Sequence, residues 1–374
     1  MSTRVSAMIG CRSMILSLLL TIMPGSATLA LAATSYHVVD IGTTGTFTTS
    51  IALGINDSGV VVGALSPGNT AYQFTEGGGF VLLDNLAGGS EAIAFDVNDA
   101  GVVVGRSNVT SGDTQAAIWS TPTTPLQLNS IGGSNFDTAF DINASGEAAG
   151  SAVFIGIPFD TSAVFWSDTG VPTDLSAELN AQGSARALND AGVVVGIFET
   201  AVPSENRAFQ WTEASGVDEL VGLQGALRTE AYGINSAGVA VGTSGAVDTP
   251  SNATRWTTPT TPEDLGLLPG STRSVARAIN DDGTIVGIAE TLTSQLAFVW
   301  TETSGLEDLN DVSDAADIGM TLLRASAINS SGQIVGTGLV GGVEHAFIAP
   351  EFAAAWPALG VLAWLYRNRL ARRA

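Results

Sequence analysis

One block of this 374-residue chain reads Leu188-Asn189-Asp190-Ala191-Gly192-Val193-Val194-Val195-Gly196, and six other blocks nearly repeat it. Each has an aliphatic residue, an asparagine, two small or acidic residues, a glycine, and a second glycine four positions later. The asparagines are Asn56, Asn98, Asn143, Asn189, Asn235, Asn280 and Asn329. They are spaced 42, 45, 46, 46, 45 and 49 residues apart, a period typical of propeller blades. The repeat is therefore the folding unit.

Each Asn-x-x-Gly segment predicts a tight hairpin between two strands. Asn can bond the backbone two residues further on, and Asp, Ser or Ala suits the next turn position. The glycine supplies the positive φ that closes the hairpin. These glycines are Gly59, Gly101, Gly146, Gly192, Gly238, Gly283 and Gly332. The Val-Val-Gly or Ile-Val-Gly runs that follow are short and β-branched, which is typical of buried strands.

The residues around each turn predict the other strands of the repeat. Four residues before the asparagine every copy has alanine, at Ala52, Ala94, Ala139, Ala185, Ala231, Ala276 and Ala325. The residue two before the asparagine is small or Asp, so we expect the two to share one face of a strand that another backbone approaches closely. About twenty residues after the asparagine, a third strand runs from alanine to an aromatic residue, as in Ala253 to Trp256. A fourth strand is typified by Glu263-Asp264-Leu265-Gly266.

The two ends of the repeat region predict how it closes. The seventh repeat stops after its third strand, at Ala349, whereas a strand of the fourth type, Tyr36 to Gly42, opens the mature chain. Pairing this N-terminal strand with the last blade would complete that blade and remove an exposed edge. We therefore predict an all-β, closed seven-bladed β-propeller of four-stranded antiparallel blades, with a β-solenoid or split sheet as the alternative.

Three segments are expected along the chain. Residues 1–32 have the features of a signal peptide, with Arg4 and Arg12 before an apolar run and an Ala30-Leu31-Ala32 cleavage site. Residues 33–349 form the seven-repeat domain. Residues 350–374 are an apolar segment with a basic end, which predicts a transmembrane anchor or a sorting signal. The mature chain has no cysteine, so its stability must come from packing and closure.

Charge excludes some partners of the repeat domain. The chain has no lysine, and the domain carries eight Arg against thirty-five Asp plus Glu, a difference of minus 27. Nucleic acid and anionic lipid are therefore not expected to bind it. The membrane is expected to be contacted only through the C-terminal segment. A monomeric ring is the expected assembly.

Two resemblances follow from these motifs. The blocks of Asn-Asp-x-Gly-x-Val-Val-Gly followed by Ala-Phe-x-Trp, with His345-Ala346-Phe347 in the last copy, resemble the bacterial extracellular HAF-repeat proteins. That resemblance implies secretion and β-rich repeats but no activity. The tail is similar in layout to PEP-CTERM sorting signals, although Pro350-Glu351-Phe352 lacks the second proline and Pro357 interrupts the apolar run. It implies export to the cell surface or extracellular matrix.

Candidate sites are few, and each has a structural explanation. Asp57, Asp99, Asp190 and Asp281 offer one side chain per turn, whereas a calcium loop needs several oxygen ligands. Arg186 and Arg277 share the position three before the asparagine, where a sialidase-like site would want an arginine cluster. His37 and His345, predicted on neighbouring strands of the last blade, are too few for zinc. We predict no catalytic, cofactor-binding or metal residues and no cofactor. Asn108 and Asn252 are glycosylation sequons in predicted loops.

Three functions remain open. The leading hypothesis is a secreted or cell-surface binding module for a glycan or surface protein, acting through the irregular insertions Ser151–Asp160 and Leu309–Leu323. The second is a carbohydrate-active hydrolase or lyase at the mouth of the channel, which a cluster of Arg, Tyr and carboxylates there would favour. The third is a passive structural component of a matrix. An enzyme is not the leading interpretation.

Overall fold

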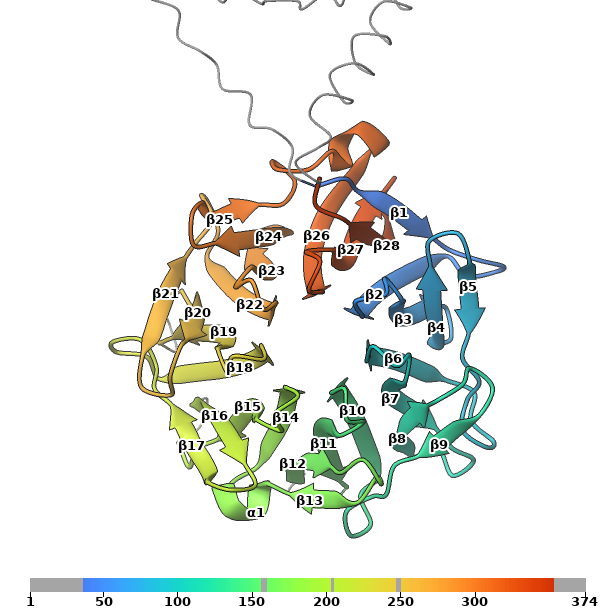
Figure 1. The fold of residues 1–374 in the computed structure, drawn as a ribbon, viewed down its shortest axis with the longest axis vertical. Helices are drawn as coiled ribbons and strands as arrows, with labels where there is room; N and C mark the ends of the chain where they lie inside the picture. Colours follow the sequence, from blue (N-terminus) through green and yellow to red (C-terminus); the bar gives the residue numbers. More distant parts are fainter. Residues whose placement is uncertain (1–35, 156–159, 203–204, 247–249, 353–374) are drawn as a thin grey trace, which may run out of the picture. The chain divides into compact units, whose positions relative to one another are not determined.

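The computed structural model describes residues 36–352 except 156–159, 203–204 and 247–249. The described chain is almost entirely β-structure and folds into four-stranded antiparallel sheets, one for each repeat. A single parallel pair, Phe136 with Thr114, links the sheets of the second and third repeats. Figure 1 shows the first strand of each repeat facing a common centre. The predicted all-β class with four-stranded antiparallel sheets is confirmed.

Each sheet has four strands, numbered here from the inner strand outward. The first, inner strands are β2 (Thr49–Ile55), β6 (Ala92–Val97), β10 (Phe136–Ile142), β14 (Gly183–Leu188), β18 (Arg228–Ile234), β22 (Arg273–Ile279) and β26 (Met320–Ile328). The second strands are β3 (Val61–Ser66), β7 (Val103–Asn108), β11 (Ala148–Phe154), β15 (Val194–Glu199), β19 (Ala240–Gly245), β23 (Ile285–Glu290) and β27 (Ile334–Val340). Each follows its inner strand through the Asn-x-x-Gly hairpin.

The outer half of each sheet contains the third and fourth strands. The third strands are β4 (Thr70–Thr75), β8 (Thr114–Trp119), β12 (Asp160–Trp166), β16 (Asn206–Thr212), β20 (Asn252–Trp256), β24 (Gln295–Thr301) and β28 (Val343–Ala349). The fourth strands are β5 (Gly79–Leu82), β9 (Pro125–Gln127), β13 (Pro172–Asp174), β17 (Gly216–Leu220), β21 (Pro262–Gly266), β25 (Gly305–Asp308) and β1 (Val39–Gly42). The helices are α1 (Ser176–Leu179) and the 3-10 helix η1 (Ala315–Ile318).

The N-terminal strand β1 completes the last sheet. It pairs antiparallel with β28, and the order of strands in that sheet is β1-β28-β27-β26. Tyr36 forms a further bridge to Glu351, so the two ends of the described chain lie beside each other. This is the pairing expected for the N-terminal strand.

The core lies between the sheets. Among the described residues there are seven buried clusters, and each joins two neighbouring sheets. One of them packs Val335, Ala346 and Ile348 of the last sheet against Ala52 and Val61 of the first. The repeated alanine is fully buried in every copy, because the sheets approach each other there.

The second glycine of each block also has a steric cause. A Cβ on any of these glycines would lie 1.9–2.2 Å from a backbone oxygen of the inner strand. They are Gly63, Gly105, Gly150, Gly196, Gly242, Gly287 and Gly336. Only glycine therefore fits at this position of the second strand, which pairs with the repeated alanine of the inner strand. At the first glycine of each block φ lies between 73° and 85°, as the hairpin prediction requires.

The repeat asparagines connect neighbouring sheets. Each is buried, and its side-chain oxygen accepts a hydrogen bond from the backbone N–H four residues further on, as from Val193 to Asn189 at 3.0 Å. Its Nδ2 donates to the backbone oxygen of the asparagine in the next repeat, at 2.9–3.3 Å. The last of these bonds runs from Asn329 to Asn56. The seven bonds therefore form a complete cycle, which we call the asparagine ring.

Candidate functional site

Every inner strand contains a β-bulge. We call the space that the inner strands surround the channel. The register of the inner and second strands shifts after the repeated alanine in all seven copies. The residue in the bulge is the one three before the asparagine, and bulges redirect side chains. These residues are Leu53, Phe95, Phe140, Arg186, Tyr232, Arg277 and Ser326. All seven line one cavity of about 310 Å³, together with Ile288, Arg324 and Ala325. We call it the arginine cavity.

The bulge also corrects one prediction. Simple alternation would place the alanine and the small residue two positions later on one face, but the extra residue interrupts that alternation. The small residues lie instead where inner strands of neighbouring sheets meet: a Cβ on Gly54 would be 2.8 Å from the Cα of Asp96. The close approach was predicted correctly, but the shared face was not.

The two candidate arginines lie together in the arginine cavity. The guanidinium of Arg186 stacks on the Phe140 ring at 4.7 Å, and that of Arg277 stacks on the Tyr232 ring at 4.3 Å. Burial lowers the pKa of Arg186, as does the nearby positive charge of Arg277. Within the described part of the chain neither arginine forms an ion pair or donates a hydrogen bond, and Nε of Arg186 is buried without a partner. An arginine remains charged in such a site.

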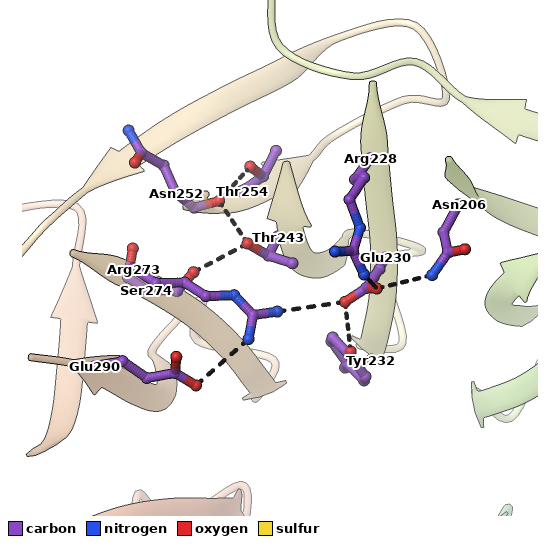
Figure 2. Close-up of polar contacts among 10 residues, drawn as sticks. All are labelled: Asn206, Arg228, Glu230, Tyr232, Thr243, Asn252, Thr254, Arg273, Ser274 and Glu290. Atoms are coloured by element: carbon purple, nitrogen blue, oxygen red, sulfur yellow. Dashed lines mark hydrogen bonds and ion pairs between the residues drawn. The ribbon is translucent and has the colours of Figure 1, made fainter. Parts of the chain in front are cut away.

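A buried glutamate lies next to Tyr232 (Figure 2). Oε2 of Glu230 accepts a hydrogen bond from the Tyr232 hydroxyl at 2.7 Å, and its Oε1 pairs with Arg228 at 3.2 Å. Arg273 lies 3.5 Å from the same carboxylate, and Asn206 donates to it. Burial alone would raise the pKa of Glu230, but these hydrogen bonds and positive charges outweigh burial and lower it. Glu230 is therefore ionised, and both of its carboxylate oxygens already have hydrogen-bond or ion-pair partners.

Tyr232 is a hydrogen-bond donor here. Burial, with the adjacent charge of Glu230, raises the pKa of Tyr232 to about 12. Its hydroxyl therefore stays protonated near neutral pH and holds Glu230. The ring meanwhile supports Arg277, so Tyr232 links the buried carboxylate to the arginine cavity.

Two carboxyls lie deeper in the channel. Asp96 and Asp141 line a cavity of about 230 Å³ that also touches Arg186, Tyr232 and Arg277. Asp141 accepts hydrogen bonds from the N–H groups of Leu188 and Ile142, at 2.8 and 2.9 Å. Burial, followed by the charge of Asp96, raises the pKa of Asp141 well above its usual range. Asp141 therefore favours its protonated form more than a solvent-exposed carboxyl does.

The opposite end of the channel carries the turn aspartates. Asp57, Asp99, Asp190 and Asp281 each accept a hydrogen bond from the first N–H after an asparagine in a neighbouring repeat, at 2.8–2.9 Å. They line a cavity of about 250 Å³ with the asparagine ring. The structure thus gives these aspartates a turn-to-turn role, in agreement with the structural interpretation of their sequence pattern.

The histidines pair with different carboxylates. Nδ1 of His37 lies 2.6 Å from Asp314, and Nδ1 of His345 lies 3.0 Å from Asp40. Both belong to the last sheet region as predicted, although His37 precedes β1 rather than lying within it. Throughout the described ranges, no group of three His, Cys, Asp or Glu residues has the geometry of a metal site.

One predicted recognition loop has a structural role instead. Leu309–Leu323 contains η1, and Leu309, Val312 and Leu322 are buried in the core beside the start of the chain. Asp314 accepts hydrogen bonds from the Val38 N–H at 2.6 Å and from His37. This insertion therefore anchors residues 36–38 and is not a free loop.

The other sequence predictions at the surface have mixed outcomes. The insertion Ser151–Asp160 begins within β11 and ends at the first residue of β12, and residues 156–159 between these strands are outside the described residues. Asn108 and Asn252 were predicted in loops, but they are the last residue of β7 and the first of β20. Their amides bond locally, to the Glu91 N–H and the Asp264 carboxylate.

Both predicted targeting segments lie mostly outside the description. Residues 1–32 and 353–374 are not described, so the signal peptide and the apolar tail stay predictions. In the parts of the chain that are described, no helix has the length and apolar character needed to cross a membrane.

Solved structures with a similar fold are β-propeller-like. A streptogramin B lyase is 10% identical, with a TM-score of 0.55, covering 86% of this chain and 99% of its own. Virginiamycin B lyase from Staphylococcus aureus is 10% identical, with a TM-score of 0.51, covering 84% and 98%. At these identities the likeness shows the fold alone, a β-propeller-like repeat fold.

Sequence comparison assigns a family without an activity. No curated protein matches the chain. A family model matches residues 83–295, more than half of the 374 residues. The chain therefore belongs to the family described as "Protein of unknown function (DUF3466)".

Proposed function

We propose that the seven sheets are the blades of one closed propeller. Three features support closure between the last and the first sheet: the shared core cluster, the bond from Asn329 to Asn56, and the bond from the Ser330 N–H to Asp57. The core cluster and the asparagine bond are contacts of the kind that join every other pair of neighbouring sheets, and the aspartate bond recurs between three of those pairs. A solenoid would leave two sheets with one unpaired face each.

We propose that this propeller is an exported binding module of the cell surface or extracellular matrix, and that it acts as a monomeric ring. The signal-like residues 1–32, the HAF-like repeats and the PEP-CTERM-like tail support export and retention. The acidic, lysine-free surface suits solubility outside the cell. The ligand is a glycan or a group on a surface protein.

The binding site that we propose is the arginine cavity. One observation carries this proposal: in a domain with a charge difference of minus 27, three of the eight arginines line one cavity beside Phe95, Phe140 and Tyr232. Its volume of about 310 Å³ lies within the range of small-molecule sites. We favour this cavity over the insertion Leu309–Leu323 because Leu309 and Leu322 are buried in the core. The insertion Ser151–Asp160 stays a prediction.

The test blocks the cavity without changing charge. Ser326→Trp would fill it, because Ser326 occupies the bulge position of the last sheet. Ser304→Trp, on the exposed turn before β25, is the matched control. We expect S326W to lose binding to a glycan array and to cells of the organism that makes this protein, and S304W to retain both. Binding that is unchanged in a folded S326W would contradict the site, and no binding by the wild type would leave the passive structural role.

A second candidate function is a hydrolase or lyase in the same channel. The cluster of Arg, Tyr and carboxylates that would favour it is present, as Arg186, Arg277, Tyr232, Asp96 and Asp141. Asp141, whose pKa is raised by burial, is the candidate general acid beside these positive charges. Turnover of acidic glycans that disappears in Asp141→Asn but survives in Asp190→Asn would support this function over binding alone.

A further inference from the structure

We infer that the arginine cavity binds an organic oxyanion, with Arg186 and Arg277 as the residues that contact the anionic group. This inference rests on the proposed function, because it names the chemistry of the ligand for the same cavity. It is carried by two partly buried guanidiniums in the cavity that pair with no carboxylate among the described residues.

The guanidinium of Arg186 lacks the partners that a buried cation needs. Its Nε is buried without a hydrogen-bond partner among the described residues, and no carboxylate there pairs with it. Burying an unpaired charge destabilises a protein strongly. A bound anion would offset that cost.

Stacking leaves the hydrogen-bonding edges of both guanidiniums available. Arg186 and Arg277 place their faces over the rings of Phe140 and Tyr232. All five N–H donors of a guanidinium lie in its plane, so they point past the ring rather than into it. Planar forks of this kind suit the oxygens of carboxylate, sulfate or phosphate.

The negative charges nearby are already compensated. Glu230 is held between Arg228 and Arg273, and Arg324 pairs with Glu344. In the deeper cavity Asp141 accepts two backbone N–H groups and Asp96 accepts one, from Ile142 at 3.2 Å. The charges on Arg186 and Arg277 therefore remain for a ligand.

The remaining walls indicate an organic body attached to the anionic group. Leu53, Phe95 and Phe140 contribute apolar surface, and the rings of Phe95 and Phe140 meet edge to face at 5.3 Å. Such a wall suits the face of a sugar or an aromatic ring. A uronate or an aromatic acid has both parts.

The experiment uses isothermal titration of the full chain with matched probes at constant ionic strength. Acetate, phosphate and sulfate distinguish the kind of oxyanion, and the pairs benzoate with benzamide and glucuronate with glucose separate charge from shape. Arg186→Gln and Arg277→Gln remove one guanidinium each. Arg255→Gln is the control, because Arg255 also stacks on an aromatic ring, Trp300 at 4.7 Å, but is neutralised by Glu263 and Glu302.

We expect the anionic member of a pair to bind and the neutral member not to bind. R186Q and R277Q should each weaken binding about ten- to a hundredfold, and R255Q should not change it. Affinity retained in folded R186Q and R277Q, or no anion bound by the wild type, overturns the inference. If the neutral and anionic members of a pair bind equally well and S326W abolishes the binding of both, the inference is overturned but the proposed function stands.

Discussion

The asparagine ring provides the sharpest test of how this fold is held together. Asn189→Ala removes a donor to the Asn235 backbone oxygen, at 3.0 Å, and an acceptor for the N–H groups of Ala191 and Val193, at 3.1 and 3.0 Å. Asn189 is only 6% exposed, so water replaces these partners poorly. A buried group without a partner costs about 1–3 kcal/mol.

The Val193 N–H is left without a partner, and the Asn235 carbonyl loses one of its two hydrogen bonds, keeping the one from the Gly238 N–H. We therefore expect N189A to lower the free energy of unfolding by about 3 kcal/mol, measured by urea denaturation followed by tryptophan fluorescence. Asp190→Ala is the matched control in the same turn. It removes one exposed bond, to the Ala144 N–H, so its cost should be about 0.5–1 kcal/mol. If N189A lowered the free energy of unfolding no more than D190A does, the stabilising role that we assign to the asparagine ring would be refuted.

Three further perturbations test separate features. Gly242→Ala should cost at least about 2 kcal/mol in thermal unfolding, because its Cβ would lie 1.9 Å from a backbone oxygen. Trp256→Phe should lower the free energy of unfolding in urea by about 2 kcal/mol, because the indole N–H of Trp256 donates to the Val221 carbonyl of the neighbouring repeat at 2.7 Å. Trp300 has no such bond among the described residues, so Trp300→Phe should lower it less. The folded pKa of Asp141 is raised, so stability should fall as pH rises above about 4. Asp96→Asn should reduce that fall in melting temperature between pH 4 and 8, and an identical slope would contradict the pairing.

Repetition made most of the fold predictable. Seven copies of Asn-x-x-Gly revealed the hairpins, and the leftover strand before Gly42 indicated which strand completes the last sheet. The sequence likewise indicated that the aspartates belong to turns and that the histidines are structural or surface residues. These inferences rest on motifs that recur along the sequence and on the number of strands in each repeat, which can be read without knowing the contacts between repeats.

The site was harder to predict because it depends on a bulge. Arg186 and Arg277 were noticed at a shared repeat position, but Phe140 and Tyr232 at the same position were not. Strict alternation hides such a set, since the bulge alone turns these residues toward the channel. Reading that position across all seven repeats is the signal that would have found them. Glu230 lies outside any repeated pattern, so only the fold brings it beside Tyr232.

The position of β28 has a mechanical consequence. This last strand lies inside its sheet, between β27 and β1, and both ladders are antiparallel. A force applied through a tether after Phe352 would therefore act on a strand that is hydrogen-bonded on both sides, and not on an edge strand that can be removed one bond at a time. Because Tyr36 also bridges Glu351, the load would be shared with the first residues of the described chain. A surface protein held by this end would resist shear at the point where it is anchored.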